Sequence, residues 1–467
     1  MLSTLPYHSA VFMSGIFSGA KIAELPNFLN QRILDTLVDG TTLSVSMTSS
    51  YSFHVLSGLF QTKVHSPLFE ISQLLYCHRT IPNLMVMEIH MKRPSNVAPR
   101  VAPTLTLRIQ RPKLELNDVN ELFLNSDNGQ LQNWRGQVKF PEVKQGENGA
   151  LVSVHFDQVP QVLELKRGLV SQKWIFMASY GHLPKESLEK YQQGQSLKME
   201  GSLLNSHINS WLENWEQGFL QVRGNTTVSS AIFSSQYSLL SEIKSSNYDD
   251  FSHTTSGLSQ CGLACMNMTL CDFGLIGNHQ EYAVIPSLVS IQPNLALELL
   301  LSRVKHYHIA LWNAVHIHHI QSVTQAAAFP WLTSNSGFEL YKDSFAAQYQ
   351  KLPSGLLAHS IELAKKYIFD TKGDSLLKNT FQETAVAIAN FYGALLQNDG
   401  SIPHVLGPYD QTFIINNSIS INLLAELSFK LARNVGNTTN KWENVEKRLK
   451  FPKARYVIHL CLICDFN

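Results

Sequence analysis

The sequence predicts a two-domain protein in which a β-rich part is followed by a helical part. Runs of alternating or β-branched residues recur up to about residue 180, and turn-rich stretches separate them. From about Ser229 onward, apolar residues recur at the three-to-four spacing of amphipathic helices. The 467 residues, 44% of them hydrophobic, suffice for two or three domains with sizeable cores.

The β-rich part covers residues 1–182, and we expect its short strands to form a sandwich or super-sandwich. RPSNVAPRVAP and KQGENGA are typical of turns between strands. The expected strands lie, in order, in TTLSVSMTSSYSFHVL, NLMVMEIHMK, TLTLRIQR, ALVSVHFDQV and KWIFMASYG.

Residues 183–228 are expected to form a helical linker, because Leu203, His207, Trp211 and Trp215 share one helical face. Residues 229–452 are expected to form the helical domain. Short loops join its helices, which indicates antiparallel neighbours. The expected helices lie in SSAIFSSQYSLLSEI, PNLALELLLSRVKHYHIALWNAV, GLLAHSIELAKKYIFD, TFQETAVAIANFYGALLQ and SINLLAELSFKLARNV.

Charge and hydropathy exclude some classes of partner. Lys and Arg total 37 and Asp and Glu total 36, without a basic stripe, so nucleic acid is not an expected partner. No apolar run approaches the roughly 18 residues that span a bilayer, so no membrane partner is expected. The first twenty residues lack the basic start of a signal peptide, and we therefore expect a cytoplasmic location.

Cysteine usage predicts neither a disulfide framework nor a metal site. Three cysteines, at positions 261, 265 and 271, are unevenly spaced and lack nearby paired ligands, which does not favour zinc. The pair Cys461-x-x-Cys464 is interpreted as incidental rather than redox-active. With Cys77, the chain holds six cysteines, which are few for this length.

Five stretches, taken in order along the chain, carry a resemblance to a known family. They are VFMSGIFSGAKIAELPNFLN, FEISQLLYCHRTIPNLMVMEI, LLNSHINSWLENWEQGFLQVRGN followed by SSQYSLLSEI, AFPWLTSNSGFEL, and VLGPYDQTFIINNSISIN. They resemble motifs of glycoside hydrolase family 65, in its acid-trehalase-like branch. The likeness runs from Tyr7 to about Pro452, and residues 453–467 form a tail that departs from it.

The resemblance implies a β-super-sandwich followed by an (α/α)6 barrel, and neither a metal nor an organic cofactor. It implies cleavage of an α-linked glucose with inversion, by hydrolysis or phosphorolysis. In one branch the substrate is the glucosyl-galactosyl unit on collagen hydroxylysine, so the expected partner is an α-glucosylated disaccharide or glycopeptide. The family's general base and closing helices have no counterpart here, so we expect an incomplete, C-terminally truncated barrel. Its uncovered apolar faces predict poor stability or pairing with another chain, such as a homodimer.

Asp410 is the candidate general acid. It stands where the family has the Glu of its PDE motif, and Tyr409 replaces the preceding Asp. Its side chain is one methylene shorter than that of Glu, and a misplacement of about 1 Å can cost on the order of a hundredfold in rate. The alternative is that Asp410 is an ordinary turn residue after Gly407 and Pro408.

Substrate binding is assigned by resemblance to five residues. In the family's FWDQ[DE]xWM-x-P motif, Gln280 and Glu281 match, whereas the Trp position is Asn278 and the first carboxylate is His279. His279 is either a hydroxyl partner or an ordinary histidine. In FPWLTSNSGFE, Trp331 and Glu339 match the family, and Trp331 either stacks on a sugar or belongs to the core.

Three hypotheses follow. The first is an inverting α-glucosidase with Asp410 as the acid, whose activity is reduced or lost because its motifs are degenerate. The second is a catalytically inactive carbohydrate-binding or structural relative, which the replacements at His279 and Tyr409 favour. The third is an incomplete product of a longer gene, which the unusual tail favours.

Overall fold

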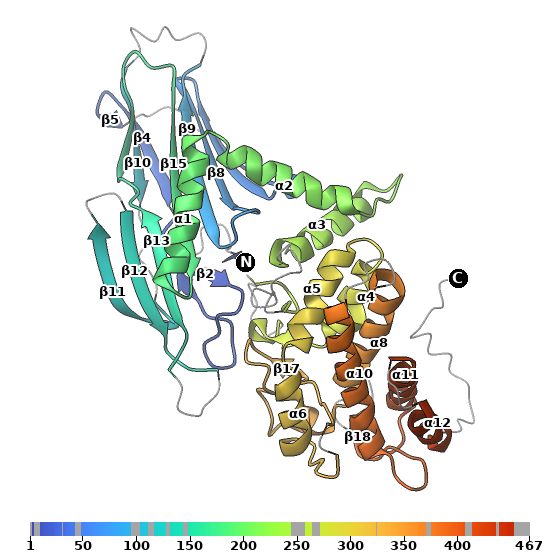
Figure 1. The fold of residues 1–467 in the computed structure, drawn as a ribbon. Helices are drawn as coiled ribbons and strands as arrows, with labels where there is room; N and C mark the ends of the chain where they lie inside the picture. Colours follow the sequence, from blue (N-terminus) through green and yellow to red (C-terminus); the bar gives the residue numbers. More distant parts are fainter. Residues whose placement is uncertain are drawn as a thin grey trace. The chain divides into compact units, whose positions relative to one another are not determined.

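A computed structural model describes most of the chain, and its contacts divide it into two compact units. The first unit contains residues 1–280, 287–302 and 333–336; the second contains 281–286, 303–332 and 337–467. The first is rich in sheet and the second is helical, which confirms the predicted order of β then α (Figure 1). The described residues are 2–3, 10–29, 31–42, 48–94, 103–110, 116–127, 131–142, 148–243, 257–263, 271–323, 325–369, 375–406, 413–435 and 439–452.

An antiparallel sheet of eight strands dominates the first unit, in the order β11-β12-β13-β15-β9-β8-β7-β6. Its central strand β9 is buried at seven of nine positions, which explains why its sequence reads as an almost continuous apolar run. The strands are β6 (Thr48–His54), β7 (Leu59–Ser66), β8 (Phe69–Cys77), β9 (Leu84–Lys92), β11 (Val119–Asp127), β12 (Leu131–Val138), β13 (Leu151–Asp157) and β15 (Ser171–Gly181).

A second, four-stranded antiparallel sheet shares a core with the first. Its order is β14-β10-β4-β5, and its core side chains Leu107 and Leu163 belong to one cluster with Met87, Trp134 and Val154 of the large sheet. Two sheets that share one core form a sandwich. The strands are β4 (Arg32–Val38), β5 (Thr41–Thr42), β10 (Leu105–Gln110) and β14 (Val162–Leu165); a small third sheet contains β1 (Leu2–Ser3), β2 (Ala10–Met13) and β3 (Leu25–Pro26).

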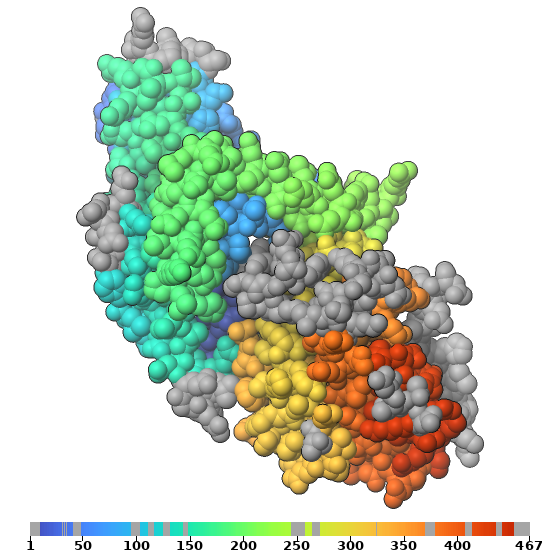
Figure 2. All heavy atoms as spheres, viewed as in Figure 1, coloured from blue at the N-terminus to red at the C-terminus, as the bar shows by residue number. Residues whose placement is uncertain are grey.

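Helix α1 (Pro184–Met199) covers the other face of the large sheet (Figure 1). Its Tyr191 packs in one cluster with Leu84 and Val86 of β9 and Met177 of β15. Gly194 provides the close approach, because a Cβ there would lie 2.8 Å from a methyl carbon of Leu84. In Figure 2 the atoms of α1, in green, pack directly against those of the neighbouring strands β13 and β15.

The strand predictions are largely confirmed, with omissions. Four of the five expected runs contain β9, β10, β13 and β15, and the first run contains β5 and β6, although its residues 43–47 lie outside the described part. β7, β8, β11 and β12 of the large sheet were not predicted, nor were β4 and β14 of the second sheet or the small strands β1, β2 and β3. Polar residues interrupt the first four, and cross-strand pairing rather than local pattern defines them.

The helical predictions are also confirmed, with one division. PNLALELLLSRVKHYHIALWNAV forms two helices, because His306 leaves helical geometry at φ −92° and ψ 19°. The remaining helices are α2 (Leu203–Gln217), α3 (Thr226–Glu242), α4 (Ile285–Leu288), α5 (Pro293–Val304), α6 (Tyr307–His316), α7 (Phe345–Tyr349), α8 (Leu352–Ala364), α10 (Ser375–Leu395), α11 (Ile419–Val435) and α12 (Thr439–Arg448). The domain boundaries at 182, 228 and 452 stay predictions.

Helix α11 is the centre of the second unit, since it packs against α8, α10 and α12. Phe429 of α11 stacks on Trp442 of α12, with ring centroids 5.8 Å apart. Gly355 of α8 lies where a Cβ would meet Leu424 Cβ at 2.5 Å and the Tyr392 hydroxyl at 2.6 Å. None of the helices in the described ranges has the length and apolar character needed to span a membrane.

Candidate functional site

Gln280 is the most constrained of the predicted substrate-binding residues in the first unit. It is fully buried, and its Oε1 accepts a hydrogen bond from the Leu258 backbone N–H at 2.9 Å. Its Nε2 group has no hydrogen-bond partner among the residues that the structure describes. A buried donor without a partner costs about 1–3 kcal/mol, so such a group calls for an explanation, for example an ordered water, an ion or a functional role. The neighbouring His279 is half-buried.

Glu281 begins the second unit and is paired with a cation. Its Oε1 lies 2.6 Å from Nε of Arg303, and the side chains are 0% and 2% exposed. Arg303 Nη2 also donates to the Pro330 carbonyl at 3.0 Å, and the Ser360 hydroxyl donates to the Glu281 carbonyl at 3.0 Å. Because both charges are buried, loss of either partner would leave the other uncompensated in the interior.

Glu339 holds the backbone that carries Trp331. Its Oε2 accepts from Trp331 N at 2.6 Å and its Oε1 accepts from Leu332 N at 3.4 Å. Burial raises the pKa of Glu339 to about 7, although these N–H groups and the charge of Arg303 act in the opposite direction. Trp331 is half-buried as a residue.

Asp410 lies outside the described residues, but the segments on either side of it are placed. Strand β18 (Val405–Leu406) pairs with β19 (Ile414–Ile415) in antiparallel register. The His404 N–H donates to Asn416 Oδ1 at 3.1 Å, and the Asn417 N–H donates to the Ile402 carbonyl at 2.8 Å. The stretch that contains Asp410 therefore connects two paired strands immediately before α11.

The NNS motif after β19 has a structural role at the start of α11. Asn422 is fully buried, and its Nδ2 donates both to Asn417 Oδ1 at 2.6 Å and to the Lys450 carbonyl at 2.8 Å. Asn417 adopts a left-handed conformation with φ 62°, which Asn tolerates better than most residues. These hydrogen bonds therefore connect the NNS motif to the first turn of α11, and the first turn of α11 to the segment after α12.

A cavity of about 270 Å³ also lies in the second unit, but its charges are already paired. Glu446 lies 3.2 Å from Arg433, and Glu443 lies 2.7 Å from Lys447. It contains none of the predicted site residues, and its lining is Glu426, Arg433, Glu443, Glu446, Lys447 and Phe451. We do not assign the candidate site to it.

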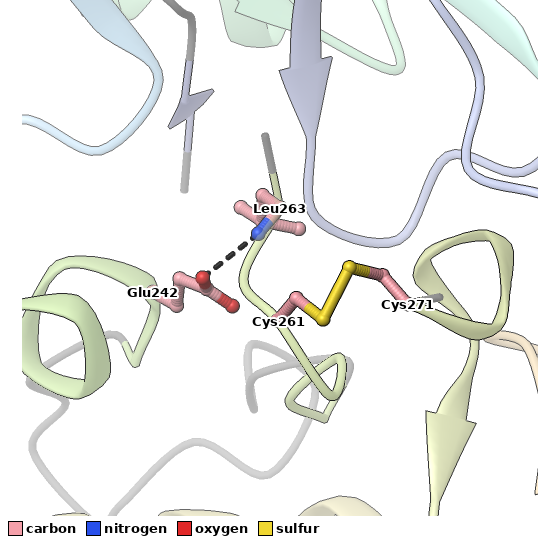
Figure 3. Close-up of a disulfide and its surroundings, with 4 residues drawn as sticks. All are labelled: Glu242, Cys261, Leu263 and Cys271. Carbon is pink, nitrogen blue, oxygen red and sulfur yellow. Dashed lines mark hydrogen bonds between the residues drawn. A yellow bond between two sulfur atoms is a disulfide. The ribbon is translucent and has the colours of Figure 1, made fainter. Parts of the chain in front are cut away.

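Sequence reasoning missed two features of these segments. The first is Arg303, whose signal was the single cation in the largely apolar run LALELLLSRV. The second is a disulfide between Cys261 and Cys271, nine residues before Gln280 (Figure 3). Two of the three cysteines for which a zinc site was considered are thus bonded to each other. No group of three or more His, Cys, Asp or Glu residues in the described ranges is arranged to hold a metal.

Comparisons with known proteins identify relatives over nearly the whole chain. It is 25% identical to protein-glucosylgalactosylhydroxylysine glucosidase of Mus musculus over 97% of its length, and 23% identical to the same-named protein of Gallus gallus. The match covers 65% and 63% of those relatives, so the chain spans less than two thirds of their length. No protein-family model matches the chain.

A solved structure shares the fold. It is a putative kojibiose phosphorylase from the human microbiome, with a TM-score of 0.66 over 94% of this chain and 61% of that one, at 14% identity. A structural likeness at this identity concerns the fold alone. Together with the curated relatives, it confirms the resemblance of the chain to glycoside hydrolase family 65.

Proposed function

We propose that the protein binds an α-glucosylated disaccharide of the glucosyl-galactosyl-hydroxylysine type and is a glucosidase-like protein whose hydrolysis is slow or lost. The names of the curated relatives support this substrate class. The observation that carries the proposal is the buried Nε2 of Gln280, for which the described ranges provide no hydrogen-bond partner. Its Oε1 is already held by Leu258, so the amide is oriented and only its donor remains for a substrate hydroxyl.

Of the other predicted residues, some are proposed to contact the sugar and others to act through a neighbouring residue. Trp331 offers part of a ring face to a sugar, and Glu339 positions it through the backbone. Glu281 acts through the ion pair with Arg303 rather than by direct contact. His279, at the family's carboxylate position, can donate to or accept from a hydroxyl but carries no fixed negative charge near neutral pH.

Asp410 is proposed as the general acid that protonates the leaving glycosidic oxygen. Inverting hydrolysis also needs a carboxylate base about 6.5–9.5 Å from the acid to activate water. Because Asp410 is one methylene shorter than the family's Glu, and Tyr409 replaces the carboxylate beside it, we propose weak hydrolysis at most. We also propose the finer fold that the resemblance implies, namely a β-super-sandwich followed by helices of an (α/α)6 barrel.

Two measurements test this proposal. The first is glucose release from glucosyl-galactosyl-hydroxylysine by the purified chain, with Asp410→Asn as the matched variant. The second is calorimetric binding of the same disaccharide, with Gln280→Leu as the matched variant. Glucose release that Asp410→Asn abolishes supports a working acid. Binding without release, weakened by Gln280→Leu, supports the inactive carbohydrate-binding alternative. The absence of both, in a folded chain, contradicts the proposal.

A further inference from the structure

The disulfide Cys261–Cys271 belongs to a pair of segments that leads directly to Gln280. Residues 257–263 and 271–280 are joined at three places. The first is the disulfide itself, the second is an antiparallel bridge between Ser259 and Ile276, and the third is the hydrogen bond from Leu258 N to Gln280 Oε1. Gln280 is therefore held at one end of this pair of segments, and the disulfide joins the two segments at the other end.

The first of these segments is anchored to helix α3. Leu263 N donates to Oε1 of Glu242, the last residue of α3, at 2.8 Å (Figure 3). Gly262 is required beside it, because a Cβ there would lie 2.4 Å from the same carboxylate oxygen. The end of α3 is held in turn by Arg79, whose Nη1 donates to the Ile243 carbonyl at 3.1 Å. Arg79 follows β8 closely, so the anchor reaches the large sheet.

The second segment contains an unfavourable turn immediately after Cys271. Asp272, Phe273 and Gly274 have φ values of 46°, 53° and 74°, so three consecutive residues are left-handed. Such a backbone persists only where its surroundings hold it. Within the turn, Gly274 N donates to the Cys271 carbonyl and Leu275 N donates to the Asp272 carbonyl, both at 2.9 Å. The disulfide at Cys271 and the hydrogen bond from Ile22 N to the Phe273 carbonyl at 2.9 Å tie the turn to other segments.

The disulfide is reachable by a reductant from one side. Cys261 is exposed, whereas Cys271 is 3% exposed. The thiolate of a dithiol can attack Sγ of Cys261 and expel the thiolate of Cys271, and its second thiol then resolves the mixed disulfide. The dithiol is oxidised to a disulfide, and its two electrons reduce the two cysteines to thiols.

We propose that the Cys261–Cys271 disulfide is a redox-dependent clamp on the segment that carries Gln280. In the oxidised chain it holds the Leu258–Gln280 hydrogen bond and with it the orientation of the Gln280 donor. Reduction by a dithiol releases the turn after Cys271, and the affinity for an α-glucosylated disaccharide falls. The effect on affinity rests on the proposed function, whereas the effect on the two segments does not.

The test compares the oxidised chain, the dithiol-reduced chain and the double variant Cys261→Ser/Cys271→Ser. Hydrogen exchange of the amides of residues 257–263 and 271–280 reports the clamp, and calorimetry with glucosyl-galactosyl-hydroxylysine reports binding. A loop of this size predicts exchange on the order of a hundredfold faster after reduction, and binding about tenfold weaker. The double variant is expected to show the exchange rates and the affinity of the reduced chain, and neither should change when the dithiol is added. A response that the double variant lacks is then due to this disulfide and not to the other cysteines.

The outcomes separate the two proposals. Faster exchange and weaker binding in both the reduced chain and the double variant support the clamp. Unchanged exchange on reduction overturns it, as does a double variant that still responds to the dithiol. Equal affinity of the oxidised and reduced chains overturns its effect on binding. If the oxidised chain binds no disaccharide, the proposed function fails, and the exchange rates alone decide whether the clamp exists.

Discussion

Arg303 and Glu281 form an ion pair in the interior of the second unit, with Nε and Oε1 2.6 Å apart. The two residues are 22 positions apart in sequence, and each holds a further segment. Arg303 donates to the Pro330 carbonyl, and Ser360 donates to the Glu281 carbonyl. The pair thus connects the start of this unit with the segment that leads to Trp331.

Arg303→Met is expected to lower the free energy of unfolding by about 3–5 kcal/mol, because it leaves the buried Glu281 carboxylate without its counter-charge. Urea unfolding at pH 7 measures this loss. The matched control is Lys447→Met, which breaks the exposed pair with Glu443 and is expected to change stability by at most about 1 kcal/mol. The double variant Arg303→Met/Glu281→Leu is expected to recover most of the loss. Equal, small effects of Arg303→Met and Lys447→Met would contradict the structural importance of the buried pair.

The elements of the fold were predictable wherever a local pattern decides the structure. Strand β9 is an apolar run because both of its faces are covered, and α11 carries a stripe because one face packs on α8, α10 and α12. Strands β7 and β8, which contain several polar residues, were not predicted in this way. Their positions depend on pairing with neighbouring strands, which a pattern within one strand does not encode.

The site was predictable in residue type but not in contacts. Motif spacing singled out Glu281, and only the fold shows that Arg303 is its partner. The bond between Cys261 and Cys271 depends on the backbone bringing their Cα atoms to 5.3 Å, which a count of six cysteines does not reveal. Disulfides are rare in the cytosol, so this bond argues against the expected cytoplasmic location, which stays a prediction.

Glu339 is expected to make stability fall as the pH rises toward neutrality. Burial raises its pKa in the folded chain to about 7, above the value near 4.5 of an unfolded chain. Its contribution is therefore fully present below about pH 4.5 and is lost as the pH rises through 7. Relative to Glu339→Gln, the wild-type chain should lose roughly 3 kcal/mol between pH 4.5 and 7.5. Urea unfolding of both chains across this range measures the difference, and a difference independent of pH would show that folding does not raise the pKa of Glu339.

Lys351 is expected to act with the opposite sign and at higher pH. Burial lowers its pKa in the folded chain to about 7 from 10.5, and its Nζ contacts His318 Nδ1 and donates to the Gln348 carbonyl. The unfolded chain therefore binds more protons between pH 7 and 10.5, and unfolding free energy rises with pH in that window. Lys351→Met should remove a rise of roughly 2–3 kcal/mol between pH 7 and 9. Lys447→Met, at an exposed lysine, serves as the control, and an equal pH dependence in both variants would refute the assignment.

Gly355→Ala is expected to destabilise the second unit, although alanine normally stabilises a helix relative to glycine by about 1 kcal/mol. The new Cβ would lie 2.5 Å from Leu424 Cβ and 2.6 Å from the Tyr392 hydroxyl, so α8 must move away from α10 and α11. Overpacking of this kind costs about 1–3 kcal/mol. Gly393→Ala in α10 is the matched control, because its Cβ would meet only Trp442 Cζ3, at 3.7 Å. Thermal and urea unfolding should therefore give opposite signs for the two substitutions. Stabilisation by both would mean that the contact of α8 with α10 and α11 is looser than the structure shows, since only a movable neighbour would accept the added methyl group.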